Sequence, residues 1–142
     1  MPGWEFIDKS EKNAINRLFN YKKSKITPPI FKSGYHVQLF EKKFAQYVGA
    51  KYAVCVTSGT AAIKIALLAA GVKPGDEVIT QTFTFIAVVE AIVDIGAIPI
   101  ITEIDETLNM CAKDLENKIT KKTKAIIPVH MLGVAVEIDK IK

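Results

Sequence analysis

The amino-acid sequence predicts an α/β fold, in which a mostly parallel sheet is connected by helical crossovers. Three observations carry this prediction. Strand patterns and helix patterns alternate several times from residue 52 onward. The strand patterns are continuous Val/Ile runs, which are typical of a sheet that is covered on both faces. Helix patterns end at Gly71 and Gly96, and a turn and a new strand follow each glycine.

The individual elements follow from local periodicity. Apolar residues recurring every three or four positions predict helices at 9–21, 37–48, 60–70, 84–95 and 113–119, and from 137 onward. Thr84 is expected to cap the helix at 84–95. Short apolar runs predict strands at 52–56, 77–80, 98–102 and 124–129. The segment 22–34 contains two consecutive prolines and is expected to be a loop.

Composition and charge narrow the class of protein. The chain has 142 residues, of which 49% are hydrophobic, so it can form a core and disorder is not expected. No run is long and charge-free enough to span a bilayer, and no signal peptide is visible. We therefore expect a cytoplasmic protein without a membrane partner. Cys55 and Cys111 have no metal-ligand spacing, and Cys55 is expected to be a reduced core thiol.

The net charge of +4 comes from the first part of the chain. Residues 1–32 hold seven Lys/Arg and three Asp/Glu, and the remainder is neutral. A basic segment could contact nucleic acid, an anionic ligand or a partner subunit. Its aromatic residues follow no nucleic-acid-binding pattern, so a solvated helix face is preferred and no nucleic-acid partner is expected. We expect a basic helix and loop at 1–34 and a separate, larger domain at 35–142.

The strongest functional signal is the turn between the strand at 52–56 and the helix that follows it. Ser58, Gly59 and Thr60 separate an apolar strand from an apolar helix. This order directs free backbone N–H groups and the positive end of a helix dipole at one point, which favours phosphate. Gly59 allows close approach, and the two hydroxyl groups add donors. A plain helix cap is the alternative interpretation.

A second signal lies at the same edge of the predicted sheet. Phe83 and Phe85 follow the strand at 77–80, and the carboxyl ends of parallel strands are where open α/β sheets bind ligands. A planar ligand held by its phosphate would need a flat apolar surface, which Phe85 can supply. Taken without the phosphate turn, the two phenylalanines would be interpreted as core residues.

Other candidate residues have weaker support. His130 could act on a ligand, but a histidine at a strand end is more often a structural hydrogen-bonding group. Lys64 shares a helix face with Thr60, although a solvent-facing lysine is preferred. The acidic residues Glu103, Asp105 and Glu106 are expected to form a solvated loop and not a metal site. The sequence has no Walker-type loop, no GxGxxG, no Ser/His/Asp elbow and no metal-ligand cluster.

Taken together, these segments resemble the DegT/DnrJ/EryC1/StrS family of sugar aminotransferases, from about residue 34 to residue 142. The resemblance depends on the order and spacing of several motifs. They include Thr57-Ser-Gly-Thr-Ala-Ala, Lys73-Pro-Gly-Asp-Glu-Val-Ile, Thr84-Phe-Ile-Ala and Ile119-Thr-Lys-Lys-Thr-Lys-Ala-Ile-Ile-Pro-Val-His. The sequence departs from the usual pattern at Gln81, where proline is common, at Val88, where Thr or Ser is common, and at Glu103 and Glu137, where Asp is more usual.

The resemblance implies a fold, a cofactor and a reaction. It implies part of the large domain of a fold-type-I enzyme that uses pyridoxal 5′-phosphate (PLP), with residues 35–142 as the first half of that domain. It places the cofactor phosphate at Ser58, Gly59, Thr60 and Ala61, and the ring at Phe85. It implies transfer of an amino group from an amino-acid donor to a nucleotide-linked keto sugar, and a homodimer. The family also contains PLP-dependent sugar dehydratases.

The resemblance also implies that important parts lie outside this sequence. No lysine here matches the one to which the family attaches its cofactor, and the carboxylate that pairs with the pyridine nitrogen is also missing. No catalytic residue and no metal ligand are therefore assigned. In the family's sheet, the strand at 52–56 would have no neighbour from this chain, which would leave its backbone groups unpaired. The 142 residues are thus expected to be inactive alone.

Two other functions remain open from the sequence. The chain could be a non-catalytic module that binds a phosphorylated ligand or a partner that completes its sheet. It could also be an ordinary doubly wound domain that binds a different phosphate ligand.

Overall fold

The computed structural model describes residues 4–20 and 34–142. It divides the chain into two compact units, residues 1–55 and residues 56–142. Among the described helices, none combines the length and the apolar character needed to cross a bilayer. The predicted loop at 22–34 lies outside the described residues except for Gly34.

The first unit is helical in its described parts. A 3-10 turn, η1 (Trp4–Phe6), precedes helix α1 (Lys9–Phe19), and helix α2 spans Tyr35–Tyr47. A capping box starts α1, because the Asp8 side chain accepts from the backbone N–H of Ser10 at 2.6 Å and the Asp8 N–H donates to Glu11 at 2.8 Å. Both predicted helices are confirmed, with ends shifted by one or two residues.

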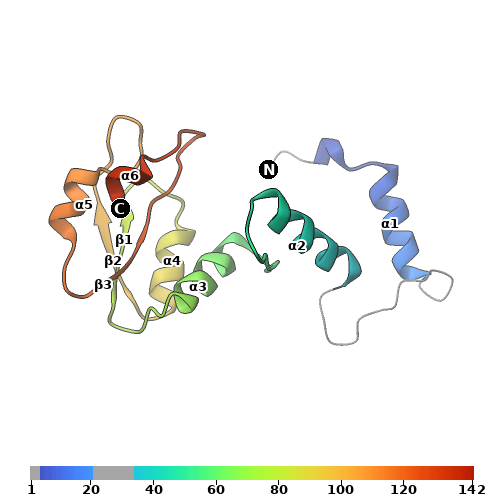
Figure 1. Cartoon of the computed structure of the whole chain (residues 1–142), viewed down its shortest axis with the longest axis horizontal. Helices are drawn as coiled ribbons and strands as arrows, with labels where there is room; N and C mark the ends of the chain where they lie inside the picture. The colour runs from blue at the N-terminus through green and yellow to red at the C-terminus, as the bar shows by residue number, and fades with distance from the viewer. Residues whose placement is uncertain (1–3, 21–33) are drawn as a thin grey trace. The chain divides into compact units, whose positions relative to one another are not determined.

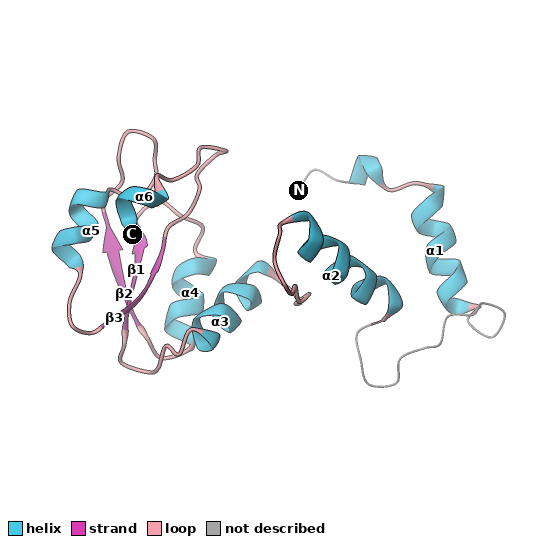
Figure 2. Ribbon diagram, viewed as in Figure 1, coloured by secondary structure: helices cyan, strands magenta, loops and turns pink. Residues whose placement is uncertain are grey.

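The second unit is an α/β structure. It contains, in chain order, α3 (Gly59–Ala69), β1 (Glu77–Gln81), α4 (Ala87–Asp94), β2 (Ile98–Thr102), α5 (Ala112–Lys118), β3 (Thr123–Ile127) and α6 (Ile138–Ile141). The three strands form one sheet in the order β2-β1-β3, and both neighbours pair with β1 in parallel (Figures 1 and 2). The predicted fold class, a parallel sheet with helical crossovers, is confirmed.

Helices cover both faces of this sheet, as the continuous Val/Ile runs predict. Val78 of β1 packs in a core cluster with Leu67 of α3 and Ile92 of α4. The next residue, Ile79, points to the opposite face and packs with Leu115 of α5 and with Met110. Figure 1 shows α3 and α4 on one side of the strands and α5 and α6 on the other. Side chains alternate along a strand, so one strand supplies both cores.

Glycine ends two helices of this unit, as expected. Gly71 and Gly96 have φ values of +80° and +75°, the left-handed conformation that closes a helix at low cost. At Gly96 space is also limited, because an added Cβ would lie 3.1 Å from the Cβ of Pro74. Helix ends that depend on local backbone conformation are therefore well predicted.

Two predictions about local structure were wrong. Residues 52–56 form no strand, and the side chains of Tyr52 and Val54 are 76% and 78% exposed. Cys55 is consequently exposed and not in the core. The physical reason is that a strand needs a neighbour for its backbone groups, and the described residues supply none. One backbone group is paired by a side chain, since the Cys55 N–H donates to Glu41 of α2 at 2.9 Å.

The second error concerns the start of α4. This helix begins at Ala87, its N-cap residue is Ile86, and no side chain caps it. The prediction that Thr84 caps this helix is therefore wrong. Residues 82–86 instead form a loop, whose last turn is closed by a bond of 3.1 Å from the Val88 N–H to the Phe85 carbonyl. This loop also accepts a hydrogen bond from the Gln81 side chain at the end of β1. Local periodicity does not predict this contact.

Candidate functional site

The turn before α3 presents unpaired backbone donors. Ser58 is the N-cap residue, and its hydroxyl accepts from the Ala61 N–H at 3.1 Å. The Ser58 carbonyl accepts from the Ala62 N–H at 3.0 Å. The N–H groups of Gly59 and Thr60 have no partner within the described residues. They lie in the first turn of an eleven-residue helix, where the dipole is positive, so an anion would be stabilised there.

The same turn leaves room for a ligand. A Cβ added to Gly59 would meet no heavy atom within 4 Å, and the φ of Gly59 lies outside the left-handed region. The glycine is therefore not required by the backbone conformation or by packing in the chain itself. Space beside two free N–H groups is what a bound phosphate would use. Ser58 and Ala61 are part of this turn, but their cap bond already occupies the Ala61 N–H.

Phe85 lies on a different segment of the same unit, the loop between β1 and α4. Its side chain is 76% exposed, so the ring face is available to a planar ligand. The preceding Thr84 hydroxyl is buried without a hydrogen-bond partner among the described residues. No hydrogen bond or ion pair in the described structure joins this loop to the turn at 58–61. The two segments are linked through packing of Leu67 of α3 against Val88 and Ile92 of α4.

Sequence reasoning missed two buried amides that join the loops at the carboxyl edge of the sheet. The Gln81 side chain donates to the carbonyls of Phe83 and Leu108 and accepts from the Val129 N–H, each at 3.0 Å. The Asn109 side chain accepts from the Met131 N–H at 3.0 Å. Both residues are at most 2% exposed. For Gln81, the signal that the sequence offers is a polar residue directly after the buried run at 78–80.

His130 takes the structural role that the sequence favoured, whereas Lys64, expected to face solvent, is half-buried in an ion pair. The Nδ1 atom of His130 accepts from the Val136 N–H at 2.9 Å, which places the proton of the neutral ring on Nε2. The ammonium of Lys64 pairs with Asp94, the last residue of α4, at 3.2 Å. A lysine held in this pair crosslinks two helices and is not directed at the phosphate turn.

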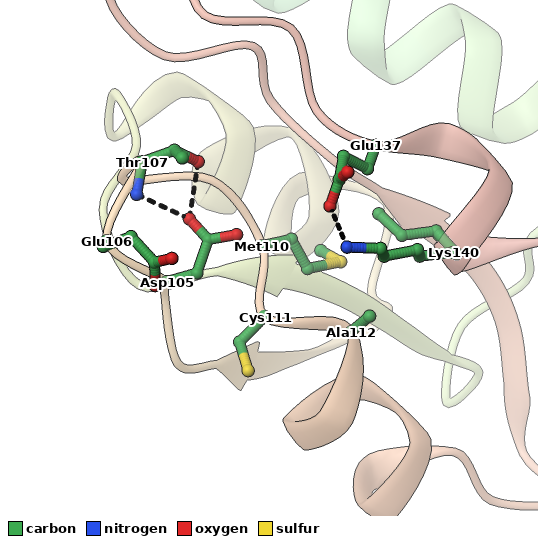
Figure 3. A pocket seen from close by; sticks show the side chains of 9 residues that line it. Asp105, Glu106, Thr107, Met110, Cys111, Ala112, Glu137 and Lys140 are labelled. Atoms are coloured by element: carbon green, nitrogen blue, oxygen red, sulfur yellow. Dashed lines mark hydrogen bonds and ion pairs between the residues drawn. The ribbon is translucent and has the colours of Figure 1, made fainter.

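The acidic loop lines a cavity of about 490 Å³ on the side of the sheet that carries α5 and α6. Figure 3 shows Asp105 bonded to Thr107, and Glu137 paired with Lys140, which lies three residues later in the chain. The Thr107 hydroxyl, 2.5 Å from the carboxylate, holds the pKa of Asp105 below its ordinary value. Within the described residues, no group of three or more His, Cys, Asp or Glu side chains is placed to hold a metal ion. The cavity is thus lined by polar groups, and the charged side chains of Asp105, Glu137 and Lys140 already have partners.

Comparison with known proteins identifies the relatives of this chain. The family model described as the DegT/DnrJ/EryC1/StrS aminotransferase family matches residues 10–142. The spore coat polysaccharide biosynthesis protein SpsC of Bacillus subtilis is 50% identical over 109 residues, which are 76% of this chain and 28% of that protein. The GDP-perosamine synthase of Escherichia coli O157:H7 is 47% identical over 113 residues, 79% of this chain and 31% of that enzyme. The chain thus spans about three tenths of the length of these relatives.

Solved structures agree with this relationship. An aminotransferase from Psychrobacter cryohalolentis matches with a TM-score of 0.84 and 32% identity, over 99% of this chain and 34% of that one. NtdA of Bacillus subtilis, solved with the bound cofactor PMP, matches with a TM-score of 0.80 and 32% identity, over 95% and 30% of the two chains. A GDP-4-keto-6-deoxymannose-3-dehydratase, solved with a trapped PLP-glutamate geminal diamine, matches with a TM-score of 0.80 and 30% identity. The match covers 95% of this chain and 35% of that one.

Proposed function

We propose that this chain, which belongs to the DegT/DnrJ/EryC1/StrS aminotransferase family, is the part of such an enzyme that holds PLP by its phosphate and its ring. The observation that carries the proposal is the pair of unpartnered N–H groups at Gly59 and Thr60, in the first turn of α3. The relatives solved with PMP and with PLP support the choice of this phosphate ester over others. Open space at Gly59 and the exposed ring of Phe85 are consistent with it.

Each residue then has a limited and definite role. Gly59 and Thr60 bind the phosphate through their N–H groups, and Ser58 and Ala61 keep the first turn of α3 in shape through the cap bond at 3.1 Å. Phe85 offers a flat apolar surface to one face of the pyridine ring. The bound cofactor would supply the electron-withdrawing ring that amino-group transfer needs. No described residue is assigned a proton-transfer role.

The substrates of the whole enzyme follow from the relatives. We propose a nucleotide-linked keto sugar and an amino-acid donor, because one relative is a GDP-perosamine synthase and another acts in spore coat polysaccharide biosynthesis. The homodimer and the cytoplasmic location expected from the sequence belong to this proposal. The dehydratase branch is a second candidate, which the match to a 3-dehydratase favours. A non-catalytic module for another phosphorylated ligand is the third.

The test uses two probes, inorganic phosphate and pyridoxamine 5′-phosphate. Neither probe forms a covalent bond with lysine. Amide NMR of the ¹⁵N-labelled chain should show both ligands shifting Gly59 and Thr60, with pyridoxamine 5′-phosphate binding about tenfold more tightly through ring contacts. Phe85→Ala should remove that excess and leave the affinity for phosphate unchanged. Phe83→Ala, in the same loop, is the matched aromatic control and should keep the excess.

The outcomes separate the candidate functions. Phosphate binding at Gly59 and Thr60 without a preference for pyridoxamine 5′-phosphate would favour the non-catalytic module. If neither ligand shifts these two amides, the proposed cofactor site is wrong. The aminotransferase and dehydratase branches differ outside this site, so this experiment addresses the shared cofactor site alone.

A further inference from the structure

We propose that Gln81 is a positioning residue for the Phe85 ring, an inference that rests on the proposed function. Gln81 is the last residue of β1, and its side chain is fully buried. Phe85 lies four residues later and is 76% exposed. The first residue has no access to a ligand, so its effect on the cofactor would pass through the backbone between them.

The Gln81 amide uses both of its donors and its acceptor on backbone groups. The nitrogen donates to the Phe83 and Leu108 carbonyls, and the oxygen accepts from the Val129 N–H, all at 3.0 Å. These partners belong to the three loops at the carboxyl edge of the sheet, after β1, β2 and β3. One buried side chain therefore sets the relative positions of these loops.

The backbone that carries the Phe85 ring is held on both sides. Before it, the Phe83 carbonyl is fixed by Gln81. After it, the Phe85 carbonyl accepts from the Val88 N–H at 3.1 Å, in the turn that leads into α4. The loop is also attached at its start, because the Thr82 N–H donates to the Thr102 carbonyl at 2.9 Å. The exposed ring thus stands on an anchored segment of backbone.

Anchoring matters for an exposed aromatic ring that must meet a planar ligand. A ring on a mobile loop loses conformational freedom when it binds, and that loss reduces affinity. A ring on a fixed backbone has already lost this freedom during folding. Gln81 therefore provides preorganisation, and its removal should weaken the ring contact more than the phosphate contact, which is made by α3.

The alternative is that Gln81 is a buried amide with a purely structural role, and Asn109 provides the control. Asn109 is equally buried and also bridges loops of this edge, through bonds to Thr107, Met131 and Val134. None of these bonds reaches the loop that carries Phe85. Asn109→Leu should destabilise the unit in a similar way without moving the ring.

The experiment compares Gln81→Met and Asn109→Leu in the full chain, with pyridoxamine 5′-phosphate and inorganic phosphate as probes. The ratio of the two affinities measures the ring contact. We expect Gln81→Met to lower this ratio about three- to tenfold while phosphate affinity stays within twofold. Asn109→Leu should leave the ratio within twofold. Gln81→Leu, which loses the acceptor and both donors, should also lower the ratio and serves if the methionine variant does not fold.

A measurement on the unsubstituted chain gives an independent test. Amide ¹⁵N relaxation at residues 82–86 should show order equal to that of β1, and fast motion in this loop would overturn the inference. An unchanged affinity ratio in either Gln81 variant would overturn it as well. These results differ from a failure of the proposed function, in which the unsubstituted chain itself shows no Phe85-dependent preference for pyridoxamine 5′-phosphate.

Discussion

The side-chain oxygen of Gln81 accepts a hydrogen bond of 3.0 Å from the backbone N–H of Val129. The bond joins the end of β1 to the segment after β3, across 48 residues of sequence. Together with the two bonds that Gln81 donates, it makes this buried amide a stabilising element as well as a positioning one. Its contribution to stability can be measured separately from any ligand.

We expect Gln81→Met to lower the free energy of unfolding by about 1–3 kcal/mol, the cost of leaving a buried polar group without its partner. The methionine side chain has a similar volume, so little of the loss should come from a cavity. Urea unfolding followed by circular dichroism measures the change. Gln46→Met, at an exposed glutamine of α2 in the other unit, is the control. A change below about 0.3 kcal/mol at Gln81 would contradict the importance of its three bonds.

Gly59→Ala should separate stability from phosphate binding. The φ of Gly59 lies outside the left-handed region and a Cβ there meets no atom, so alanine should raise helix stability by up to about 1 kcal/mol. The added methyl group would occupy the space beside the free N–H groups, and phosphate affinity should fall about tenfold. Thermal unfolding and phosphate titration measure the two effects. Lys64→Met is the control on the same helix, since its ammonium is paired with Asp94. Equal phosphate affinity in Gly59→Ala would show that the anion binds elsewhere.

Thr107→Val should raise the pKa of Asp105 toward its ordinary value, because the hydroxyl bond is the largest cause of its lowered pKa. The sign for stability follows from the depressed pKa. The contribution of Asp105 is present above the ordinary carboxyl pKa and is lost as the pH falls through the lowered value. Carboxyl ¹³C NMR titration of Asp105 measures the shift, with the exposed Thr82→Val as control. An unchanged midpoint would assign the lowered pKa to the N–H bonds from Thr107 and Asn109 instead.

Cys55 should react faster with a thiol reagent than Cys111, because Cys55 is exposed and Cys111 is half-buried. Ellman's reagent, applied to the native chain at neutral pH, should give a fast and a slow phase. Cys55→Ser should remove the fast phase, and Cys111→Ser should remove the slow one. A slow Cys55 would indicate that residues 52–56 are covered, for example by pairing with another strand.

The candidate site was predictable where it depends on local features. The turn at 58–61 was recognised because small residues follow an apolar run and precede an apolar helix, and the structure places an N-cap at Ser58. Its binding role stays a prediction. In the sequence, Gln81 stands out only as a departure from a family pattern, because its partners lie as far as 27 and 48 residues away. Nothing near Gln81 in the sequence specifies these contacts.

The sequence by itself determined which segments become helices, where glycine ends them, and that the sheet is parallel with both faces covered. These features depend on side-chain period and backbone conformation, which are properties of a few neighbouring residues. Only the tertiary structure decided that residues 52–56 do not form a strand, that Cys55 is exposed, and that Gln81 joins three loops. A strand or a buried amide is satisfied only by partners distant in sequence, and these are brought within bonding distance by the fold.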